Sequence, residues 1–254
     1  MFRPRVIPLL LLKNKGLVKS VKFKDYRYIG DPINTVKIFN DLKADELVFL
    51  DILATQEKRT ISLDFVKNVG EEANMPFAVG GGISTIEDIG KIIAAGAEKV
   101  VISAAAVANT NFVREASSTF GSSTITVCID TKKNIFGKNK VWTNNGRKQS
   151  PFSPVEFAQL MEQQGAGEII IQSISNDGMM HGYDLEMIKQ ISKAVSIPVV
   201  AAGGAENMED LRLAHSKAFA SAVAAGSMFV YHGARKGILV NYPERVQLTN
   251  LFNK

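Results

Sequence analysis

Two glycine-rich segments follow short apolar runs and could bind phosphate through their backbone. Gly80-Gly81-Gly82 ends one run, and Gly203-Gly204 ends another. Glycine lets backbone N–H groups approach a phosphate closely, and the start of a following helix adds a favourable dipole. The alternative is that these glycines only make tight turns. Because there are two such segments, we predict a ligand with a phosphate at each end.

Small residues follow two further apolar runs. One run ends in Ser103-Ala104-Ala105, and the other ends in Ala225-Gly226-Ser227. Small side chains leave room for a ligand, and serine hydroxyl groups can donate hydrogen bonds to it. The expected phosphate-binding residues are therefore Gly81, Gly82 and Ser103 in one site, and Gly203, Gly204, Gly226 and Ser227 in the other.

Three carboxylates lie at or just after the ends of apolar runs: Asp51, Asp130 and Asp177. Asp130 ends an apolar strand, so it predicts a partly buried carboxylate suited to acid–base catalysis. Its counterpart at the end of the first run is Leu11, so only one acid is available. Asp51 and Asp177 are candidate substrate ligands, with capping of loop N–H groups as the alternative.

Four charged residues lie at the opposite ends of such runs, where the runs begin: Arg5, Glu46, Lys99 and Glu168. Four charges together inside a protein are costly unless they are paired, and two positive and two negative groups can neutralise one another. One interpretation is an electrostatic plug that seals one end of the fold. The other is a gate, since a charged ring can open to a small polar molecule where packed leucines cannot. The residues alone favour the plug.

Eight strand-like apolar runs position these residues, and amphipathic helix candidates lie between them. The runs span residues 5–11, 46–51, 76–80, 99–103, 124–130, 168–173, 198–202 and 221–225. Helix candidates include 32–42, 62–73, 85–95, 154–164 and 185–195. Strands that are apolar on both faces are typical of parallel sheets covered by helices. Eight such units in 254 residues predict a single (βα)₈ TIM barrel, a domain spanning residues 1–254.

An internal repeat divides this barrel into two halves. The segment Met75-Pro-Phe-Ala-Val-Gly-Gly-Gly82 resembles Ile197-Pro-Val-Val-Ala-Ala-Gly-Gly204, and residues 46–50 match residues 168–172 at the same offset. A period this long is not that of a solenoid. We therefore expect two half-barrels of four βα units each.

Two long basic loops should lie at the carboxyl ends of strands 1 and 5. They span residues 13–31 and 131–152. Loops of this length in a compact domain are often functional, so a lid over a phosphorylated substrate is one hypothesis. The alternative is two solvated loops whose lysines only aid solubility.

Composition excludes several other classes of protein. The net charge is +5, but basic residues are scattered, so nucleic-acid binding is not expected. No apolar stretch approaches the roughly 20 residues that span a bilayer, and we identify no signal peptide. The single cysteine, Cys128, fits a reducing compartment, which predicts a cytoplasmic protein. The three histidines show no ligand spacing, so we expect neither a metal nor a cofactor.

Together these features resemble the HisF family, the cyclase subunit of imidazole glycerol phosphate synthase. The resemblance covers nearly the whole chain. The motifs that carry it are weak evidence singly, but in this order and spacing they are strong evidence for the family. They are Arg5-Val-Ile-Pro8, Gly30-Asp-Pro32, Asp45-Glu-Leu-Val-Phe-Leu-Asp51, Pro76-Phe-Ala-Val-Gly-Gly-Gly-Ile83, Cys128-Ile-Asp130, Gly165-Ala-Gly-Glu168, Asn176-Asp-Gly178, Gly182-Tyr-Asp184 and Ala202-Gly-Gly-Ala205.

The resemblance implies a barrel that accepts ammonia from a HisH-type glutamine amidotransferase bound at its N-terminal face. Ammonia would enter through a charged gate, travel along the barrel axis and react with a bisphosphorylated ribulosyl intermediate at the mouth. Arg5, Glu46, Lys99 and Glu168 match the gate, which changes the preferred interpretation from plug to gate. Asp130 matches one catalytic aspartate, Lys19 matches a loop lysine, and the glycine-rich ends match the two phosphate sites.

Departures from the family pattern place cyclisation in doubt. Leu11 stands where the second catalytic aspartate is expected, and Val101, Ala104 and Met179 replace polar residues. Residues 4–8 and the segment Gly16-Leu-Val-Lys19 look like a paralogous branch associated with sugar amidation in surface-polysaccharide biosynthesis. In that branch the barrel would pass ammonia to a separate sugar amidotransferase. Two alternatives stay open: a working cyclase of histidine biosynthesis, and a non-catalytic scaffold for the glutaminase.

Overall fold

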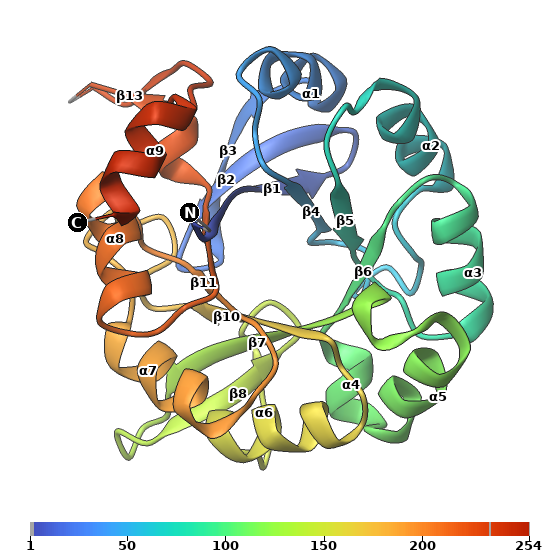
Figure 1. The fold of residues 1–254 in the computed structure, drawn as a ribbon. Coiled ribbons are helices and arrows are strands. Elements are labelled where there is room, and N and C mark those ends of the chain that lie inside the picture. The colour runs from blue at the N-terminus through green and yellow to red at the C-terminus, as the bar shows by residue number, and fades with distance from the viewer. Residues whose placement is uncertain (1–2, 234, 254) are drawn as a thin grey trace.

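Eight parallel strands form a closed barrel in the computed structural model, which describes residues 3–233 and 235–253 (Figure 1). The barrel strands are β1 (Arg5–Lys13), β4 (Leu47–Asp51), β5 (Phe77–Gly80), β6 (Lys99–Ile102), β7 (Ile125–Lys133), β10 (Glu168–Ser173), β11 (Val199–Ala202) and β12 (Ala222–Ala225). Each strand pairs in parallel with the next. The ring closes where β1 pairs with β12, with Arg5 opposite Ala222. The predicted (βα)₈ TIM barrel is confirmed.

Helices cover the outside of the barrel (Figure 1). They are α1 (Pro32–Asp41), α2 (Leu63–Glu72), α3 (Ile86–Ala94), α4 (Ala104–Ala108), α5 (Asn111–Phe120), α6 (Pro154–Gln163), α7 (Leu185–Ala194), α8 (Met208–Ser216) and α9 (Arg245–Phe252). Their starts follow ordinary capping chemistry, as where Asp31 accepts a hydrogen bond from the Asn34 backbone and Pro32 opens α1. Ser153 and Glu156 form a capping box at α6 in the same way.

Successive side chains along each strand point to opposite faces of the barrel wall, so they form two separate hydrophobic clusters. On β1, Val6, Leu10 and Leu12 pack in the cluster that includes buried helix residues. Ile7, Leu9 and Leu11 point the other way, into the barrel interior. Small residues contribute much of that interior cluster: Ala78, Ala202, Ala222 and Ala224. The barrel axis is therefore packed with smaller side chains than the layer between strands and helices.

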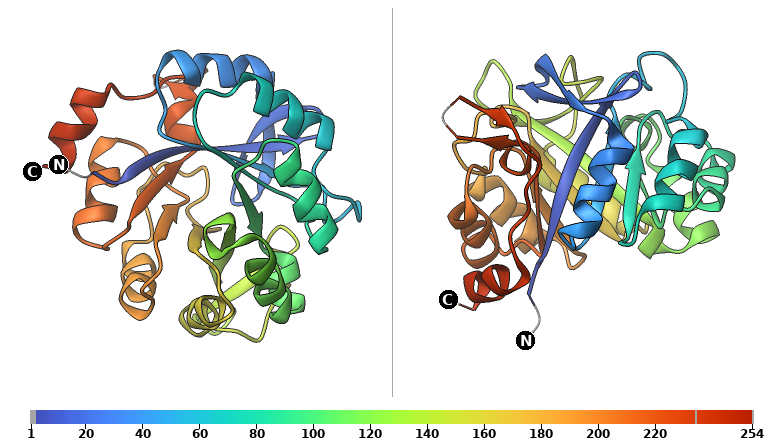
Figure 2. Two further views of the ribbon diagram at one scale, coloured as in Figure 1. Left: turned by 45° about the vertical axis from the view of Figure 1, so that its right-hand side comes forward. Right: turned by 90° about the horizontal axis from the view of Figure 1, so that it is seen from above.

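Both long loops contain antiparallel hairpins, which no pattern in the sequence predicted. After β1 the chain forms β2 (Gly16–Val21) and β3 (Lys24–Gly30), and β2 pairs back onto β1. After β7 it forms β8 (Asn139–Thr143) and β9 (Lys148–Gln149), and β8 pairs back onto β7. The first strand of each half-barrel thus carries a hairpin, in agreement with the repeat. Figure 2 shows these hairpins at the side of the barrel opposite to the start of β1.

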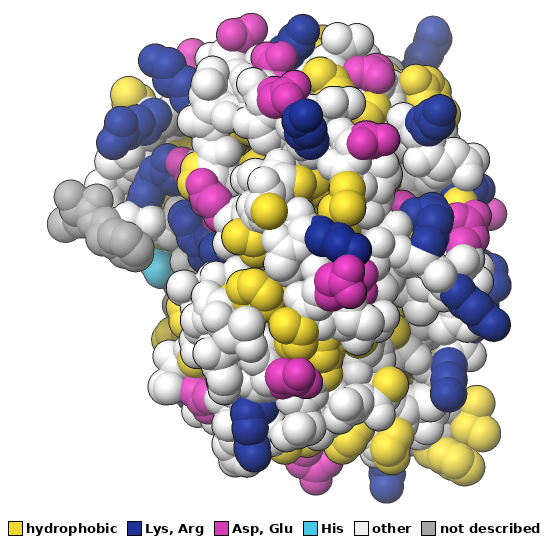
Figure 3. All heavy atoms as spheres, turned by 90° about the vertical axis from the view of Figure 1, so that its right-hand side faces the viewer, with side chains coloured by type: hydrophobic (Ala, Val, Ile, Leu, Met, Phe, Trp, Pro, Cys, Tyr) yellow, Lys and Arg dark blue, Asp and Glu magenta, His cyan; other side chains and the backbone are white. Residues whose placement is uncertain are grey.

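Short elements complete the description: η1 (Ser122–Thr124), η2 (Ser227–Phe229), β13 (Tyr231–His232) and β14 (Gly237–Ile238). In the part of the chain that the structure describes, no helix is both long and apolar enough to cross a membrane. The face over α2 and α3 carries basic and acidic side chains interspersed rather than massed (Figure 3). That mixed surface agrees with the expectation that the basic residues are scattered.

Candidate functional site

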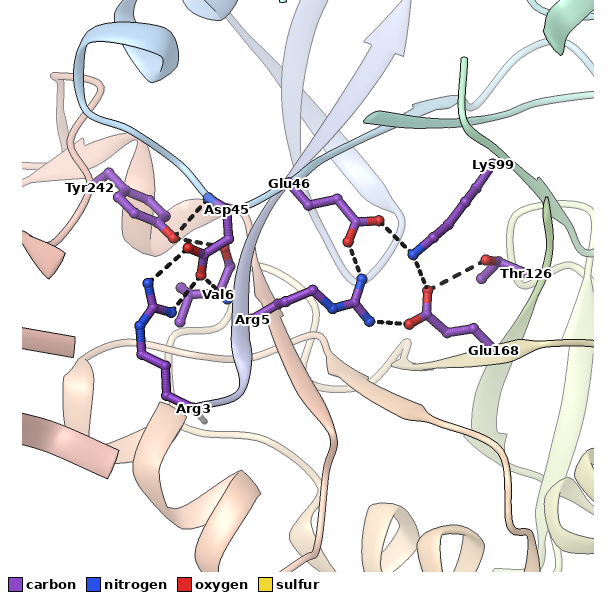
Figure 4. Close-up of polar contacts among 9 residues, drawn as sticks. All are labelled: Arg3, Arg5, Val6, Asp45, Glu46, Lys99, Thr126, Glu168 and Tyr242. Carbon is purple, nitrogen blue, oxygen red and sulfur yellow. Dashed lines mark hydrogen bonds and ion pairs between the residues drawn. The ribbon is translucent and has the colours of Figure 1, made fainter. Parts of the chain in front are cut away.

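The four charged residues at the N-terminal end of the barrel form a closed ring of ion pairs (Figure 4). The Arg5 guanidinium donates hydrogen bonds to Glu46 and to Glu168. Across the ring, the Lys99 ammonium lies 3.1 Å from a carboxylate oxygen of Glu46 and 3.1 Å from one of Glu168. Every charge therefore has two partners of opposite sign, and the residues predicted from sequence to lie together do so.

Burial makes this ring different from a surface salt bridge. The side chains of Glu46 and Glu168 are only 3% and 9% exposed. Burial alone would lower the pKa of Arg5, but the Glu168 and Glu46 carboxylates outweigh it and raise that pKa. A buried charge without its partner raises the free energy of the folded protein. Breaking one ion pair of the ring is therefore unfavourable, and the pair tends to form again.

A second network beside the ring fixes the backbone around Arg5. Asp45 accepts hydrogen bonds from both terminal nitrogens of Arg3, at 2.6 and 2.8 Å, and from the Val6 backbone N–H at 2.9 Å. The Tyr242 hydroxyl donates to the Val6 carbonyl at 2.9 Å and accepts from the Asp45 N–H (Figure 4). This network could not be predicted from the sequence, because no spacing signal connects Tyr242 to the start of β1.

A cavity of about 760 Å³ opens at the carboxyl ends of β1, β4, β5, β6 and β7. Its lining includes the residues predicted for the first phosphate site, Gly81, Gly82 and Ser103. Gly82 has φ +66°, and a Cβ there would lie 1.8 Å from the carbonyl oxygen of Arg59. Only glycine fits so close to that backbone, so Gly82 is required by packing as well as suited to anion binding.

Asp51 lines this cavity and also makes hydrogen bonds within the protein. It accepts hydrogen bonds from the backbone N–H groups of Leu53 and Ala54, as the capping alternative supposed. It also holds Arg59, with the guanidinium 2.6 Å from its carboxylate. Arg59 itself lines the cavity. Arg59 was not predicted from the sequence, because it lies in the loop after β4, outside any motif.

Asp130, on β7, also lines this cavity. Burial raises the pKa of Asp130 to about 7, against the lowering effect of a hydrogen bond from the Cys128 thiol at 3.7 Å. A carboxyl group with this pKa can both accept and donate a proton near neutral pH. Leu11 and Val101 line the cavity as well, so the groups around Asp130 include apolar side chains at these two positions.

The second predicted phosphate site surrounds a much smaller cavity, of about 30 Å³. The structure brings together the four residues predicted for it, Gly203, Gly204, Gly226 and Ser227, and places Lys19 and Asp177 beside them. Lys19 is buried, and its ammonium donates to the Leu9 carbonyl at 2.8 Å. Burial lowers the pKa of Lys19 to about 8, and the Asp177 carboxylate counteracts part of that shift.

Asp177 ties the β2–β3 hairpin to the loop after β10. Its carboxylate accepts a hydrogen bond from the Ser20 hydroxyl at 2.6 Å, and its carbonyl accepts one from the Lys22 N–H at 2.9 Å. Gln172 also donates to Asp177, at 3.2 Å. Within residues 3–233 and 235–253, no cluster of three or more His, Cys, Asp or Glu could hold a metal ion.

Comparison with known proteins decides the family. A family model described as histidine biosynthesis protein matches residues 5–235. A Pseudomonas aeruginosa protein named "Putative imidazole glycerol phosphate synthase subunit hisF2" is 43% identical over 244 residues, which cover 96% of this chain and 97% of that protein. The chain belongs to the HisF family. A protein of Alkaliphilus metalliredigens named "Imidazole glycerol phosphate synthase subunit HisF" is 42% identical over 232 residues, 91% of this chain and 92% of its own length.

The chain is thus a HisF-like synthase subunit. A further relative, named "Putative imidazole glycerol phosphate synthase subunit HisF" in Leptospira interrogans, is 39% identical over 253 residues and covers 99% of this chain and 100% of its own length. This HisF-family barrel keeps its charged ring at one end and its Asp130 cavity at the other. Its two glycine-rich ends, alike in sequence, differ in the space that they enclose.

Proposed function

We propose that this subunit receives ammonia from a HisH-type glutamine amidotransferase at the N-terminal face of the barrel and conducts it along the axis. The observation that carries the proposal is the ring of Arg5, Glu46, Lys99 and Glu168 at the N-terminal end. A ring held by ion pairs can exchange one pair for a transient polar guest. Packed aliphatic side chains at the same place would only seal the barrel.

The interior beyond the ring suits a small neutral molecule. Val48, Ala78, Val200, Ala222 and Ala224 contribute to the barrel's inner cluster. Neutral ammonia crosses an apolar path at little desolvation cost, whereas the ammonium ion does not. The path would therefore deliver ammonia to the C-terminal end while it excludes ammonium from the solvent.

The acceptor of the ammonia is the finer part of the proposal. Leu11 can neither donate nor accept a proton, so Asp130 lacks the second acid of the HisF pair. Loss of one general acid or base typically costs about 10²–10⁴-fold in rate. We therefore propose that a separate cytoplasmic enzyme, a sugar amidotransferase of surface-polysaccharide biosynthesis, consumes the ammonia.

A second candidate is the imidazole glycerol phosphate cyclase itself. The observation that favours it is Asp130, whose pKa of about 7 suits acid–base catalysis, in a cavity of about 760 Å³ that also holds Arg59. The third candidate, a scaffold that binds the glutaminase and conducts nothing, requires no free path along the axis.

The experiment that tests the proposal uses extracts of cells that lack this chain but contain the glutaminase and the sugar amidotransferase. Glutamine-dependent amidation of the polysaccharide sugar is followed by mass spectrometry, with and without added purified chain. We expect amidation to depend on the added chain. Equal amidation in its absence would overturn the proposal. Addition of Leu11→Asp should restore amidation as well as the wild type does, since that position is not needed for conduction.

A further inference from the structure

Two large hydrophobic side chains project from the tip of the β7–β8 hairpin. Ile135 is 93% exposed and Phe136 is 79% exposed, which makes them the most exposed large hydrophobic residues in the part of the chain that the structure describes. Single exposed hydrophobic residues are ordinary on a protein surface. Two neighbours at a projecting tip are instead typical of a surface that binds a partner.

Hydrogen bonds hold this tip in a fixed turn. The Asn134 side-chain oxygen accepts from the backbone N–H groups of Phe136 and Lys138, each at 3.0 Å. The Asn134 N–H donates to the Lys138 carbonyl at 2.9 Å, and the Gly137 N–H donates to the Asn134 carbonyl at 3.0 Å. Gly137 has φ +73°, which glycine adopts without strain. The turn therefore presents Ile135 and Phe136 to a partner with little further ordering, which favours binding.

The charged residues around the tip are all basic. Within residues 131–155 the chain has no Asp or Glu. Its basic residues there are Lys132, Lys133, Lys138, Lys140, Arg147 and Lys148. Interfaces pair an apolar centre with a polar rim, and the charges of the two rims are complementary. The surface that fits this tip is therefore an apolar pocket with an acidic rim.

The hairpin rises from the C-terminal end of the barrel (Figure 2), and its base lines the large cavity through Asn144 and Asn145. The Asn145 amide donates to the Ile52 carbonyl at 2.7 Å, which ties the hairpin to the loop after β4. From Asp130, which lines the cavity, β7 runs on to Lys133, about 10 Å further at about 3.3 Å per residue. An ordinary interface covers about 800 Å² of each partner, a patch about 30 Å across. A protein bound at the tip thus also covers the cavity.

Two other occupants fit the tip less well. In a two-fold dimer that buried the tips against each other, the basic residues of one copy would repel those of the other. On an anionic membrane, two apolar side chains give only weak attachment, since interfacial helices bind through a whole apolar face. An acidic protein surface with a pocket matches both the apolar pair and the lysines.

We propose that Ile135 and Phe136 insert into an acidic-rimmed apolar pocket on the enzyme that consumes the ammonia, and that this contact holds that enzyme over the C-terminal end of the barrel. The proposal rests on the proposed function, because it names the surface that binds the acceptor enzyme. Ammonia that leaves the barrel then enters the acceptor without passing through the solvent. The glutaminase binds at the opposite face, so both partners can be bound at once.

The experiment measures binding of the purified full chain to the purified sugar amidotransferase by biolayer interferometry, without glutaminase. We expect Ile135→Ser and Phe136→Ser each to weaken binding by about tenfold or more, because a few buried anchors carry most of the affinity of an interface. Val246→Ser, at a 67% exposed position on α9, is the matched control and should bind like the wild type. An amidotransferase that does not bind the wild type, or that binds Phe136→Ser as tightly, would overturn the proposal.

Charge reversal tests the acidic rim. Lys138→Glu should weaken binding by about tenfold at low salt and by less at about 0.5 M salt, because salt screens exposed charges. Lys67→Glu reverses a lysine on α2 whose side chain is 69% exposed, and it should change the affinity little. If both reversals weaken binding equally, the partner has no acidic surface that is specific to the tip, and the proposal is wrong.

Two further measurements test the other occupants. If the wild type sediments with phosphatidylglycerol vesicles, Phe136→Ser does not, and neither binds the amidotransferase, the tip is a membrane contact and the proposal fails. It also fails if sedimentation equilibrium shows a dimer that Phe136→Ser abolishes. The binding assay involves no ammonia. Its failure is therefore distinguishable from a failure of conduction, which is reported by whether amidation depends on the added chain.

Discussion

Leu11 on β1 and Asp130 on β7 line the same cavity, so an apolar side chain stands where a second carboxylate would complete an acid–base pair. Asp51 and Asp88 also line this cavity, but position 11 offers no carboxylate to pair with Asp130.

The first prediction concerns this missing acid. Leu11→Asp should raise the rate of imidazole glycerol phosphate formation from the bisphosphorylated ribulosyl substrate and ammonium salt by about 10²-fold or more, since it supplies a second proton-transfer group. The wild type should show little activity in the same assay. Leu11→Asn, which is similar in size and polarity but not acidic, is the control. A wild type as fast as the Leu11→Asp variant would support the cyclase instead.

Because the pKa of Asp130 is raised in the folded protein, its contribution to the free energy of unfolding should fall as pH rises towards 7. Its pKa is about 7 in the folded chain, whereas it titrates near about 4 when unfolded. Between these values the folded state holds a proton that the unfolded state has lost, so the free energy of unfolding declines by up to about 1.4 kcal/mol per pH unit. Asp130→Asn removes this contribution.

Urea unfolding at pH 5 and pH 8 checks the sign. Relative to wild type, Asp130→Asn should gain stability as pH rises from 5 to 7, and the difference should level off above 7. Other titrating groups cancel in the comparison between the two proteins. A difference that is the same at both pH values would show that Asp130 has an ordinary pKa.

The ion pairs of the charged ring should stabilise the folded protein. Glu46→Gln leaves Arg5 and Lys99 with one carboxylate between them, so it should lower the free energy of unfolding by about 2–4 kcal/mol. Glu87→Gln removes an exposed carboxylate that pairs with Lys91 on α3, and it should leave the free energy of unfolding nearly unchanged. Equal effects of the two substitutions in urea unfolding would mean that the ring is no more than a solvated surface cluster.

Gly178 should be required for the position of the β2–β3 hairpin. Gly178→Ala places a methyl group 1.9 Å from the Ser20 carbonyl oxygen at φ +68°. We expect a loss of about 2–4 kcal/mol, the sum of left-handed backbone strain and overpacking. Gly233→Ala has the same φ with nothing within 4 Å, so it should show the backbone strain alone. If both variants unfold at the same urea concentration, the close contact carries no energy.

The barrel could be predicted from the sequence because the apolar runs that form its strands, and the glycines that follow them, are local signals. All eight strands were found, and the four ring residues were expected together because each begins a strand. The hairpins were missed because residues 13–31 and 131–152 are polar and exposed in part, so pairing with β1 and β7 decides their structure. For the same reason β1 runs to Lys13 rather than ending at Leu11.

The site was predicted less completely than the fold. Asp51 was expected as a substrate ligand or as a loop cap. Its contact with Arg59 could not be predicted, because it is set by the local backbone of a loop that no motif describes. Tyr242 reaches Val6 across nearly the whole length of the chain, and such a contact leaves no periodic signal. The two glycine-rich ends were predicted as equivalent, because the burial of Lys19 against Gly226 depends on how the hairpin folds back.

The most direct test of ammonia conduction is an isotope competition in the extract that lacks the chain. Purified chain is added with glutamine labelled with ¹⁵N in its amide and an excess of unlabelled ammonium, and the label in the amidated sugar is measured. Wild type should give product carrying mostly ¹⁵N, because ammonia stays inside the barrel. Ala202→Trp, which fills the inner cluster, should give product with the isotope ratio of the solution. Product from wild type that already has the isotope ratio of the solution would contradict conduction through the barrel.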